Sequence, residues 1–413
     1  MIGSIFTSTA GMTTFSEALD IIGNNVSNMN TPGYKGQEMI FKDLFYQNQT
    51  GENRDGSNTT IQTGSGSEIG STVIRTNQGE TRETSSDTDI AIDGNGFFLL
   101  RDGTETYYSR AGRFEFNEDQ TLVDTTTGYK VAGITSDGNL EDISIAGDRL
   151  NPAQATTYVN FEGTLNSNID DGNSYTIPTD TPNPDDAKVI VYDSIGNKHE
   201  LEIKFTKVGF VSGSTTQMVW LVEVSEDGNV LATEEIRYES GSPMEEYNSV
   251  LVELRPGTGA TADITLDLSD TRMLSAASST IAVKDDDGID GIPFGSLVSI
   301  KFDEEGKMTL QYSNGEEMAG QQIALALFND VHALKLKGDN LYEAIAGQNP
   351  IISNPGNQGL GNVIGGSIEL SNVELSMEFS DIIIAQRGYQ ACSHLMNVSN
   401  EMIQQLFELG GNR

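Results

Sequence analysis

Seven-residue repeats of apolar residues at both ends of the chain constrain its fold more than any other feature. Near the N-terminus, one register holds Ile5, Met12, Leu19 and Val26, and the companion register holds Ser8, Phe15, Ile22 and Met29. This a/d pattern predicts a coiled-coil helix of about 40 Å, at 1.5 Å per residue. Its threonines and glycines are poor helix formers, so the helix needs a partner to persist. We expect it to end within Asn28–Gly33, where Pro32 cannot continue it.

The C-terminal segment carries a matching repeat. Ser371 and Glu374 form a capping box that predicts the start of a helix. The repeat then runs through Leu375, Ile382, Tyr389, Met396 and Ile403, with Ala385, Cys392 and Leu406 in the companion register. Cys392 is the only cysteine, so no disulfide can form within the chain. Its place in the repeat predicts a small buried packing residue and not a reactive thiol.

Either repeat alone would suit an ordinary amphipathic helix on a globular core. Two repeats at opposite ends of one glycine-rich chain favour a coiled coil, in which the helices pair with each other, with other copies of the chain, or both. The predicted subunit-packing seam consists of Ile5, Met12, Phe15, Leu19, Ile22, Val26, Leu375, Ile382, Tyr389, Cys392, Met396, Ile403 and Leu406.

The chain between these repeats has the pattern of short strands. Thr88–Ile92 alternates polar and apolar residues, a glycine turn follows, and Phe97–Leu100 leads to a second turn at Asp102–Gly103. Further Asp-Gly and Asn-Gly turns favour antiparallel meanders, barrels or sandwiches over alternating strands and helices. The predicted fold class is therefore mainly β, a discontinuous multi-domain chain with a terminal α-helical coiled coil and β-barrel-like or sandwich-like domains.

A chain of 413 residues exceeds what one core usually serves. We predict a coiled-coil domain from 1–34 and 367–413, and linkers at 35–70 and 347–366, which are rich in Gly, Asn, Ser and Gln. A discontinuous β domain is predicted from 71–147 and 288–346, and an acidic β domain from 148–287.

Charge narrows the possible partners. The chain has 61 acidic against 24 basic residues, a formal charge of -37, so phosphates and anionic membrane surfaces would be repelled. Residues 141–290 hold 28 acids against 9 bases, which is typical of a highly solvated surface. No apolar run approaches the roughly 18 to 20 residues that span a bilayer, so no membrane insertion is expected. The start does not resemble a secretory signal peptide, which predicts export by another route if the protein leaves the cytoplasm.

Catalytic and ligand-binding patterns are weak. The three histidines, His199, His332 and His394, lie far apart amid structural patterning. Asp285 and Asp287 resemble part of a calcium loop, but Phe294 stands where a closing carboxylate is needed. We therefore expect no catalytic residue, no metal site and no cofactor, and predict that the protein is not an enzyme.

Three groups of residues together carry a resemblance to a known protein family. The first is Asn24, Asn25, Asn28, Gly33 and Tyr34, the second is Asp89–Phe98 with Gly94, Gly96 and Phe97 followed by Ser109–Phe114, and the third is Asn372–Ser376 followed by Gln386 and Arg387. In this order they resemble the signatures of the bacterial flagellar axial proteins, which comprise rod, hook and hook-junction subunits. Segments 191–201, 325–329 and 338–342 favour the hook branch over the shorter rod subunits. Glu118–Gln120 replaces a turn glycine of the family, and 151–190 matches nothing in it.

This resemblance implies a chain that folds back on itself, with both termini innermost and the acidic middle outward. It implies a structural subunit of the flagellar hook, a curved tubular polymer that acts as a universal joint between rod and filament. The implied partners are other copies of the chain, the rod, hook-cap and hook-filament junction proteins, and the flagellar export apparatus. The implied location is extracellular, in the flagellum, without a cleaved signal peptide. The alternatives are a distal-rod subunit or a secreted β-rich adhesin or carbohydrate-active protein, although the middle of the chain holds one tryptophan, Trp220, for a sugar site.

Overall fold

The structure, a computed structural model, describes two compact units. The described residues are 2–52, 58–135, 138–177, 188–214, 216–255, 262–284, 288–345 and 347–410. The first unit comprises Met1–Ala146, Ser299–Leu310 and Met318–Arg413, and the second comprises Gly147–Val298 and Gln311–Glu317. The calcium-like residues 285–287 and most of the proline-bearing stretch near 182 lie outside the described residues. The predicted division into inner, middle and outer domains stays a prediction.

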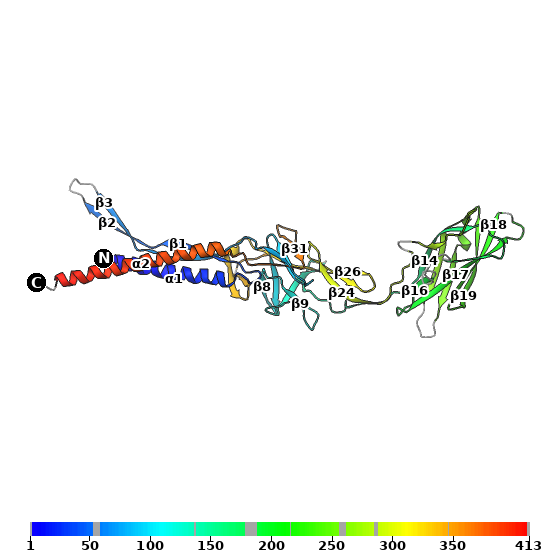
Figure 1. Ribbon diagram of the computed structural model, residues 1–413, viewed down its shortest axis with the longest axis horizontal. Helices are drawn as coiled ribbons and strands as arrows, with labels where there is room; N and C mark the ends of the chain where they lie inside the picture. The colour runs from blue at the N-terminus through cyan, green and yellow to red at the C-terminus, as the bar shows by residue number, and fades with distance from the viewer. Residues whose placement is uncertain are drawn as a thin grey trace. The chain divides into compact units, whose positions relative to one another are not determined.

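Two long helices pack side by side in the first unit. Helix α1 spans Ile2–Ser27 and α2 spans Leu375–Gly410, and they run antiparallel (Figure 1). All other regular structure in the described residues is strand or short 3-10 turn. The predicted fold class, mainly β with terminal helices, is confirmed.

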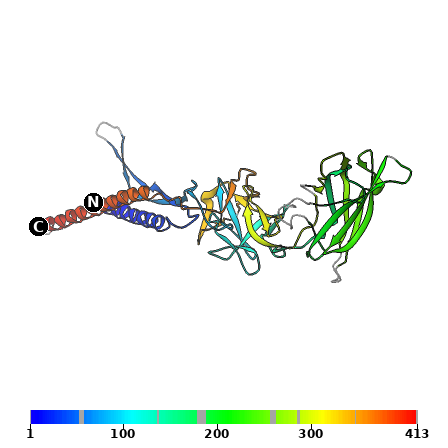
Figure 2. The same cartoon turned by 45° about the vertical axis from the view of Figure 1, so that its right-hand side comes forward.

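The segment predicted as the first linker, residues 35–70, contains paired strands. β1 (Gln37–Asp43) pairs antiparallel with β4 (Ser67–Ile74), and β2 (Tyr46–Glu52) pairs with β3 (Asn58–Gly64). Figure 2 shows these strands leaving the helix pair as one long hairpin. Ladder hydrogen bonds come from the backbone, so a segment poor in apolar residues can still form a strand when its partner strand returns alongside.

The segment predicted as the second linker, residues 347–366, also contains strands that pair. β31 (Asn362–Gly365) pairs with β6 (Ile90–Asp93), and β30 (Ile351–Ser353) pairs with β27 (Leu325–Leu327). Composition does not reveal this pairing, because the partner strands are distant in sequence.

The first unit contains a β body beside the helix pair. Its further strands are β5 Thr81–Glu83, β7 Phe97–Asp102, β8 Glu105–Ser109, β9 Phe114–Phe116, β10 Leu122–Asp124, β11 Lys130–Ile134, β12 Leu140–Asp142, β28 Leu334–Gly338, β29 Leu341–Ala344 and β32 Ser367–Glu369, with the 3-10 turn η3 Val331–Ala333. β24 Gly295–Phe302, β25 Lys307–Tyr312 and β26 Glu317–Ile323 contribute residues to both units. Aromatic rings fill the core, where Phe97 packs edge-on against Phe328 and Tyr342.

The second unit is built from two sheets. One has the order β21 (Ser249–Leu254), β22 (Ala262–Leu274), β14 (Tyr158–Asn166), β23 (Ala282–Val283), with β14 and β22 parallel. The other has the order β15 (Ser174–Thr176), β17 (Lys198–Phe210), β18 (Gln217–Glu226), β19 (Asn229–Glu239), β20 (Ser242–Pro243), with β16 (Val189–Tyr192) beside β17. The short strand β13 (Leu150–Asn151) pairs with β24, and η2 covers Glu245–Tyr247.

The core of the second unit holds the alternate residues of these strands. Along β17 every second side chain is buried, and Trp220 on β18 is fully buried among them. Trp220 therefore belongs to the core, and its ring is not exposed to bind a sugar.

Candidate assembly site

The two helices meet along a seam of small residues. Four layers lie seven residues apart in each helix: Ser4 with Ser399, Gly11 with Cys392, Ala18 with Ala385, and Asn25 with Glu378. The numbers in each pair add to 403, which is the register expected of an antiparallel pair. The serine oxygens are 3.1 Å apart, and a Cβ on Gly11 would lie 2.7 Å from the sulfur of Cys392. The helices thus approach closely because most layers lack a large side chain.

One large residue fills the gap between two layers. The ring of Phe15 lies over Gly388, whose Cβ, if it had one, would be 2.4 Å from the ring carbon Cζ. Phe15 and Ile22, with Ile382 from the other helix, surround the alanine layer. A glycine opposite an aromatic ring is therefore a packing requirement in this seam.

The predicted seam is brought together only in part. Phe15, Ile22, Ile382 and Cys392 lie in the contact between the helices, and Ile22 is fully buried. Ile5, Met12, Leu19, Val26, Met396 and Ile403 are half-buried at its edges, whereas Leu375, Tyr389 and Leu406 are exposed.

The buried register of α1 is one residue before the first predicted series. It runs through 11, 18 and 25, with the exposed Ser4 at its start, and not through 5, 12, 19 and 26, which are half-buried. The apolar pattern favoured the larger residues, but Gly11 and Ala18 leave space that lets the backbones approach. The signal that could have revealed this is the set of small residues recurring at the same spacing in both helices.

A buried carboxylate joins the segments that flank the helices to the β body. The side chain of Glu369 on β32 is fully buried, and its Oε1 accepts from Lys35 Nζ at 2.6 Å and from the backbone N–H of Gly79 at 2.8 Å. Its other oxygen accepts from Arg110 Nε at 2.6 Å. Burial lowers the pKa of Lys35, and the charge of Glu369 opposes that shift. Two cations therefore share one buried anion.

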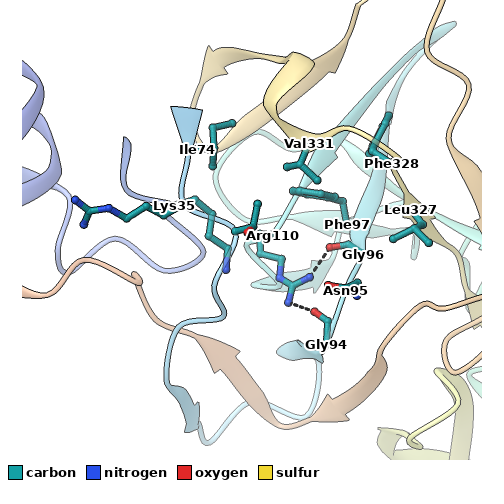
Figure 3. A pocket seen from close by; sticks show the side chains of 12 residues that line it. Lys35, Ile74, Gly94, Asn95, Gly96, Phe97, Arg110, Leu327, Phe328 and Val331 are labelled. Atoms are coloured by element: carbon teal, nitrogen blue, oxygen red, sulfur yellow. Dashed lines mark hydrogen bonds between the residues drawn. The ribbon is translucent and has the colours of Figure 1, made fainter. Parts of the chain in front are cut away.

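Arg110 also closes the glycine turn between β6 and β7. Its guanidinium donates to the carbonyl oxygens of Gly94 and Gly96, as Figure 3 shows, and to that of Ile92 at 3.3 Å. Gly94 and Gly96 have φ of 111° and 134°, a backbone region that favours glycine. The glycines allow the turn, and the arginine donates hydrogen bonds to its converging carbonyl oxygens. A cavity of about 280 Å³ lies beside this turn.

A second buried carboxylate holds the start of α2. Glu378 is fully buried, and its Oε1 lies 2.6 Å from a guanidinium nitrogen of Arg75. Asn25 on α1 donates to Glu378 and to the carbonyl of Gln37, and its Oδ1 accepts from the Gln37 N–H at 2.9 Å. Tyr34 donates to the same Asn25 oxygen, and burial raises the pKa of Tyr34.

The remaining family-motif residues differ in role. Asn24 and Asn28 are hydrogen-bonded to each other and end the first helix. Gly33 has φ of 72°, and a Cβ there would lie 2.4 Å from the backbone nitrogen of Ala111. Gln386 and Arg387 are exposed on α2, outside the contact with α1.

Sequence reasoning missed the polar residues that fix this junction. Arg75, Glu369 and Glu378 were not singled out, and Lys35 and Arg110 were noted only as parts of family motifs. Charged residues are common in a chain with 61 acids, so no sequence signal separates the buried ones from the solvated ones.

The histidines lie in separate elements, His199 on β17, His332 in η3 and His394 on α2. His199 bridges Glu226, at 2.6 Å from Nδ1, and Asp193, at 3.3 Å from Nε2. Burial opposes protonation, but the hydrogen bonds and charges of Glu226 and Asp193 outweigh it and raise the pKa of His199. The described residues contain no group of three His, Cys, Asp or Glu side chains placed to hold a metal ion. Among the same residues, neither helix is apolar enough over its length to cross a membrane.

Four models of known protein families match parts of this chain. The model "Flagella basal body rod protein" matches residues 5–35, "Flagellar hook protein FlgE/F/G D1 domain" matches 91–165, "Flagellar basal body protein FlaE D2 domain" matches 164–377, and "Flagellar basal body rod FlgEFG protein C-terminal" matches 364–409.

Full-length relatives give the same result. The flagellar hook protein FlgE of Treponema pallidum is 28% identical over 99% of this chain and 100% of its own length. The FlgE of Salmonella typhimurium is 28% identical over 97% of this chain and 98% of its own. A solved Helicobacter pylori hook protein, FlgE2, has a TM-score of 0.44 at 15% identity, covering 68% of this chain and 98% of that chain. Because one family model spans more than half of the chain and the others cover both ends, the chain belongs to the flagellar hook and rod protein family, as a hook subunit.

Proposed function

We propose that copies of this chain polymerise through their helix pairs into a curved tube, which passes torque from the rod to the filament as a universal joint. The observation that carries this proposal is the apolar surface that the helix seam leaves uncovered. Leu375, Tyr389 and Leu406 are exposed, although their spacing is that of packing residues. An isolated subunit would leave this surface in water, whereas neighbouring copies would bury it.

The exposed residues lie on more than one side of α2. Ile383 and Ile384 are exposed near its start, and Leu395 and Val398 are exposed further along. Such a helix can contact two or more neighbours through different surfaces. Contacts of this heterologous kind generate an open helical polymer instead of a closed ring. We propose that Ile5, Met12, Leu19, Val26, Met396 and Ile403, which are half-buried, complete these contacts.

The buried polar junction supports a mechanical role. Glu369 and Glu378 tie the segments next to both helices to the β body through charge-assisted hydrogen bonds. Such bonds are short and directional, so they resist rotation of the helix pair against the body. Torque applied to the helices would be carried into the body without slippage.

The acidic second unit suits an outward position, where neighbouring copies must move past one another as a curved tube turns. Residues 141–290 carry 28 acids against 9 bases, and solvated charged surfaces adhere weakly. We further propose an extracellular location in the flagellum, export by its own apparatus, and contacts with the rod, hook-cap and hook-filament junction proteins.

Electron microscopy of the purified, polymerised protein tests the proposal. We expect short curved tubes; straight tubes would instead indicate a rod subunit, and no polymer would contradict assembly. Tyr389→Glu, at an α2 site that is 42% exposed, should prevent assembly because a charge would enter the subunit contact. The matched control is Phe210→Glu in the second unit, at a site that is 59% exposed, and it should still form tubes.

A further inference from the structure

The far end of α2 presents an apolar surface that α1 does not cover. In the described residues α1 begins at Ile2, which the seam register places opposite Glu401. Beyond that point lie Met402, Ile403, Leu406 and Phe407, and Phe407 is 76% exposed, the highest value among the large apolar side chains described on the two helices. Figure 1 shows α2 continuing past the start of α1.

These four residues form one face, and this face continues the seam. Their spacing of three and four places them on one side of the helix. Leu406 follows Ser399 by seven residues, and Ile403 follows Met396 by seven. The overhang, defined here as residues 402–407, therefore has the pattern of a packed helix without a partner among the described residues.

The opposite end of the helix pair presents a hollow of matching character. A cavity of about 230 Å³ is lined by apolar side chains from both helices and from β1, chiefly Phe15, Ile22, Met39, Phe41 and Ile384, and by the charged side chains of Glu38, Arg75 and Asp381. Pockets for small ligands are usually about 300–1,000 Å³, so this hollow suits one bulky side chain better. Phe41 and Ile384 are exposed at its rim, and they would gain contacts from an occupant.

We infer that the overhang of one subunit packs into this hollow on a second copy of the chain, with Phe407 as the inserted side chain. The same chain cannot make the contact, because Phe407 lies 22 residues beyond Ala385 along a continuous helix, about 33 Å away at 1.5 Å per residue. Surface and hollow lie at opposite ends of one helix pair, so the contact repeats from copy to copy and builds a continuous row. This inference rests on the proposed homopolymer, which supplies one overhang for every hollow.

Cysteine cross-linking within the assembled polymer tests the contact. Cys392→Ala first removes the native thiol, and the smaller side chain fits beside Gly11. Phe407→Cys and Phe41→Cys are then combined in that chain, polymers are oxidised mildly, and products are separated without reductant. The matched control combines Phe407→Cys with Phe210→Cys, since Phe210 is also an exposed phenylalanine on a strand.

We expect a ladder of dimers, trimers and longer species from the first pair, because each chain would bond to a different copy at each end. The control pair should give none. Polymers without a ladder, or an equal ladder from the control, would overturn the inference and leave the proposed function intact. A parent chain that forms no polymer would overturn both.

A second variant covers the case in which Phe407→Cys impairs assembly. Phe407→Asp should lower polymer yield about tenfold or more, because it would bury a further negative charge beside Glu38 and Asp381, where the one lining cation, Arg75, is already paired with Glu378. Glu408→Gln, at the adjacent exposed position, should leave the yield unchanged. Equal yields from the two variants would overturn the inference.

Discussion

Glu369→Gln removes the charge of the buried junction while keeping the size of its side chain. In the native protein two cations, Lys35 and Arg110, and the N–H of Gly79 converge on a carboxylate with no exposed surface. A glutamine keeps one acceptor oxygen, but its NH₂ group must face one of these donors. Breaking a buried ion pair from one side costs about 3–5 kcal/mol, because the remaining charge stays buried and unpaired. We expect the first unit to lose that much stability.

Urea unfolding of the full chain measures this loss, with an internal reference. Trp220 is the only tryptophan and is buried in the second unit, so its fluorescence reports that unit. Both helices belong to the first unit, so far-ultraviolet circular dichroism follows it through its helical signal. With slopes of about 2–3 kcal/mol per molar urea, the circular dichroism midpoint of Glu369→Gln should fall by roughly 1–2 M. The fluorescence midpoint should stay unchanged.

The matched control is Glu68→Gln, which removes an exposed pair with Lys42 and should cost at most about 1 kcal/mol. A Glu369→Gln loss no larger than that of the control would refute the reasoning, as would a change in the fluorescence midpoint. Alkaline pH adds a second check. In the native protein the charge of Glu369 limits how far burial lowers the pKa of Lys35. Without Glu369 that pKa falls further, so Lys35 loses its ammonium proton more readily in the variant. The deficit should therefore narrow as the pH approaches the 10.5 of an ordinary lysine.

Three further results are expected. Gly11→Leu should destabilise the helix pair by about 1–3 kcal/mol through overpacking. Gly23→Ala, whose added Cβ would meet nothing within 4 Å, should stabilise α1 by about 0.5–1 kcal/mol. Equal thermal unfolding midpoints for the two variants would contradict the close approach of the helices. Because the pKa of His199 is raised in the folded protein, protonated His199 stabilises the second unit, fully so below pH 6.5. This contribution should be lost as the pH rises through the folded pKa. A His199→Gln chain whose unfolding, followed by Trp220 fluorescence, has the same pH dependence as the native chain would contradict this. Limited proteolysis of the monomer should remove both helices and leave a core of roughly residues 75 to 370, because lone subunits lack the neighbours that cover the helices; full-length resistance would contradict partner-dependent ends.

The structure gives the junction and the seam different mechanical tasks. The seam uses close backbone approach, which makes the helix pair narrow but provides little apolar burial of its own. The junction uses buried charges, which lose stability when either partner is removed and therefore specify one orientation of the helices. A pair that is weak alone and firmly oriented suits a subunit that becomes stable only in an assembly.

The sequence by itself determined the fold class, the two terminal helices, the strand-rich middle and the resemblance to the flagellar axial proteins. These features depend on local periodicity, on turn residues such as Gly94 and Gly96, and on Pro32, which cannot continue the first helix. Each is encoded within a few consecutive residues, so it can be recognised without knowing what packs against it.

Only the tertiary structure decided the seam register, the strands in the supposed linkers and the buried polar junction. Gly11 meets Cys392 across the seam, and Lys35 meets Glu369 across 334 residues of chain. Each such contact depends on the distance between residues far apart in sequence. A heptad pattern marks which residues could be buried, but the smallest side chains decide how closely the backbones approach. The burial of the Glu369 carboxylate can be recognised only when the fold has placed both cations around it.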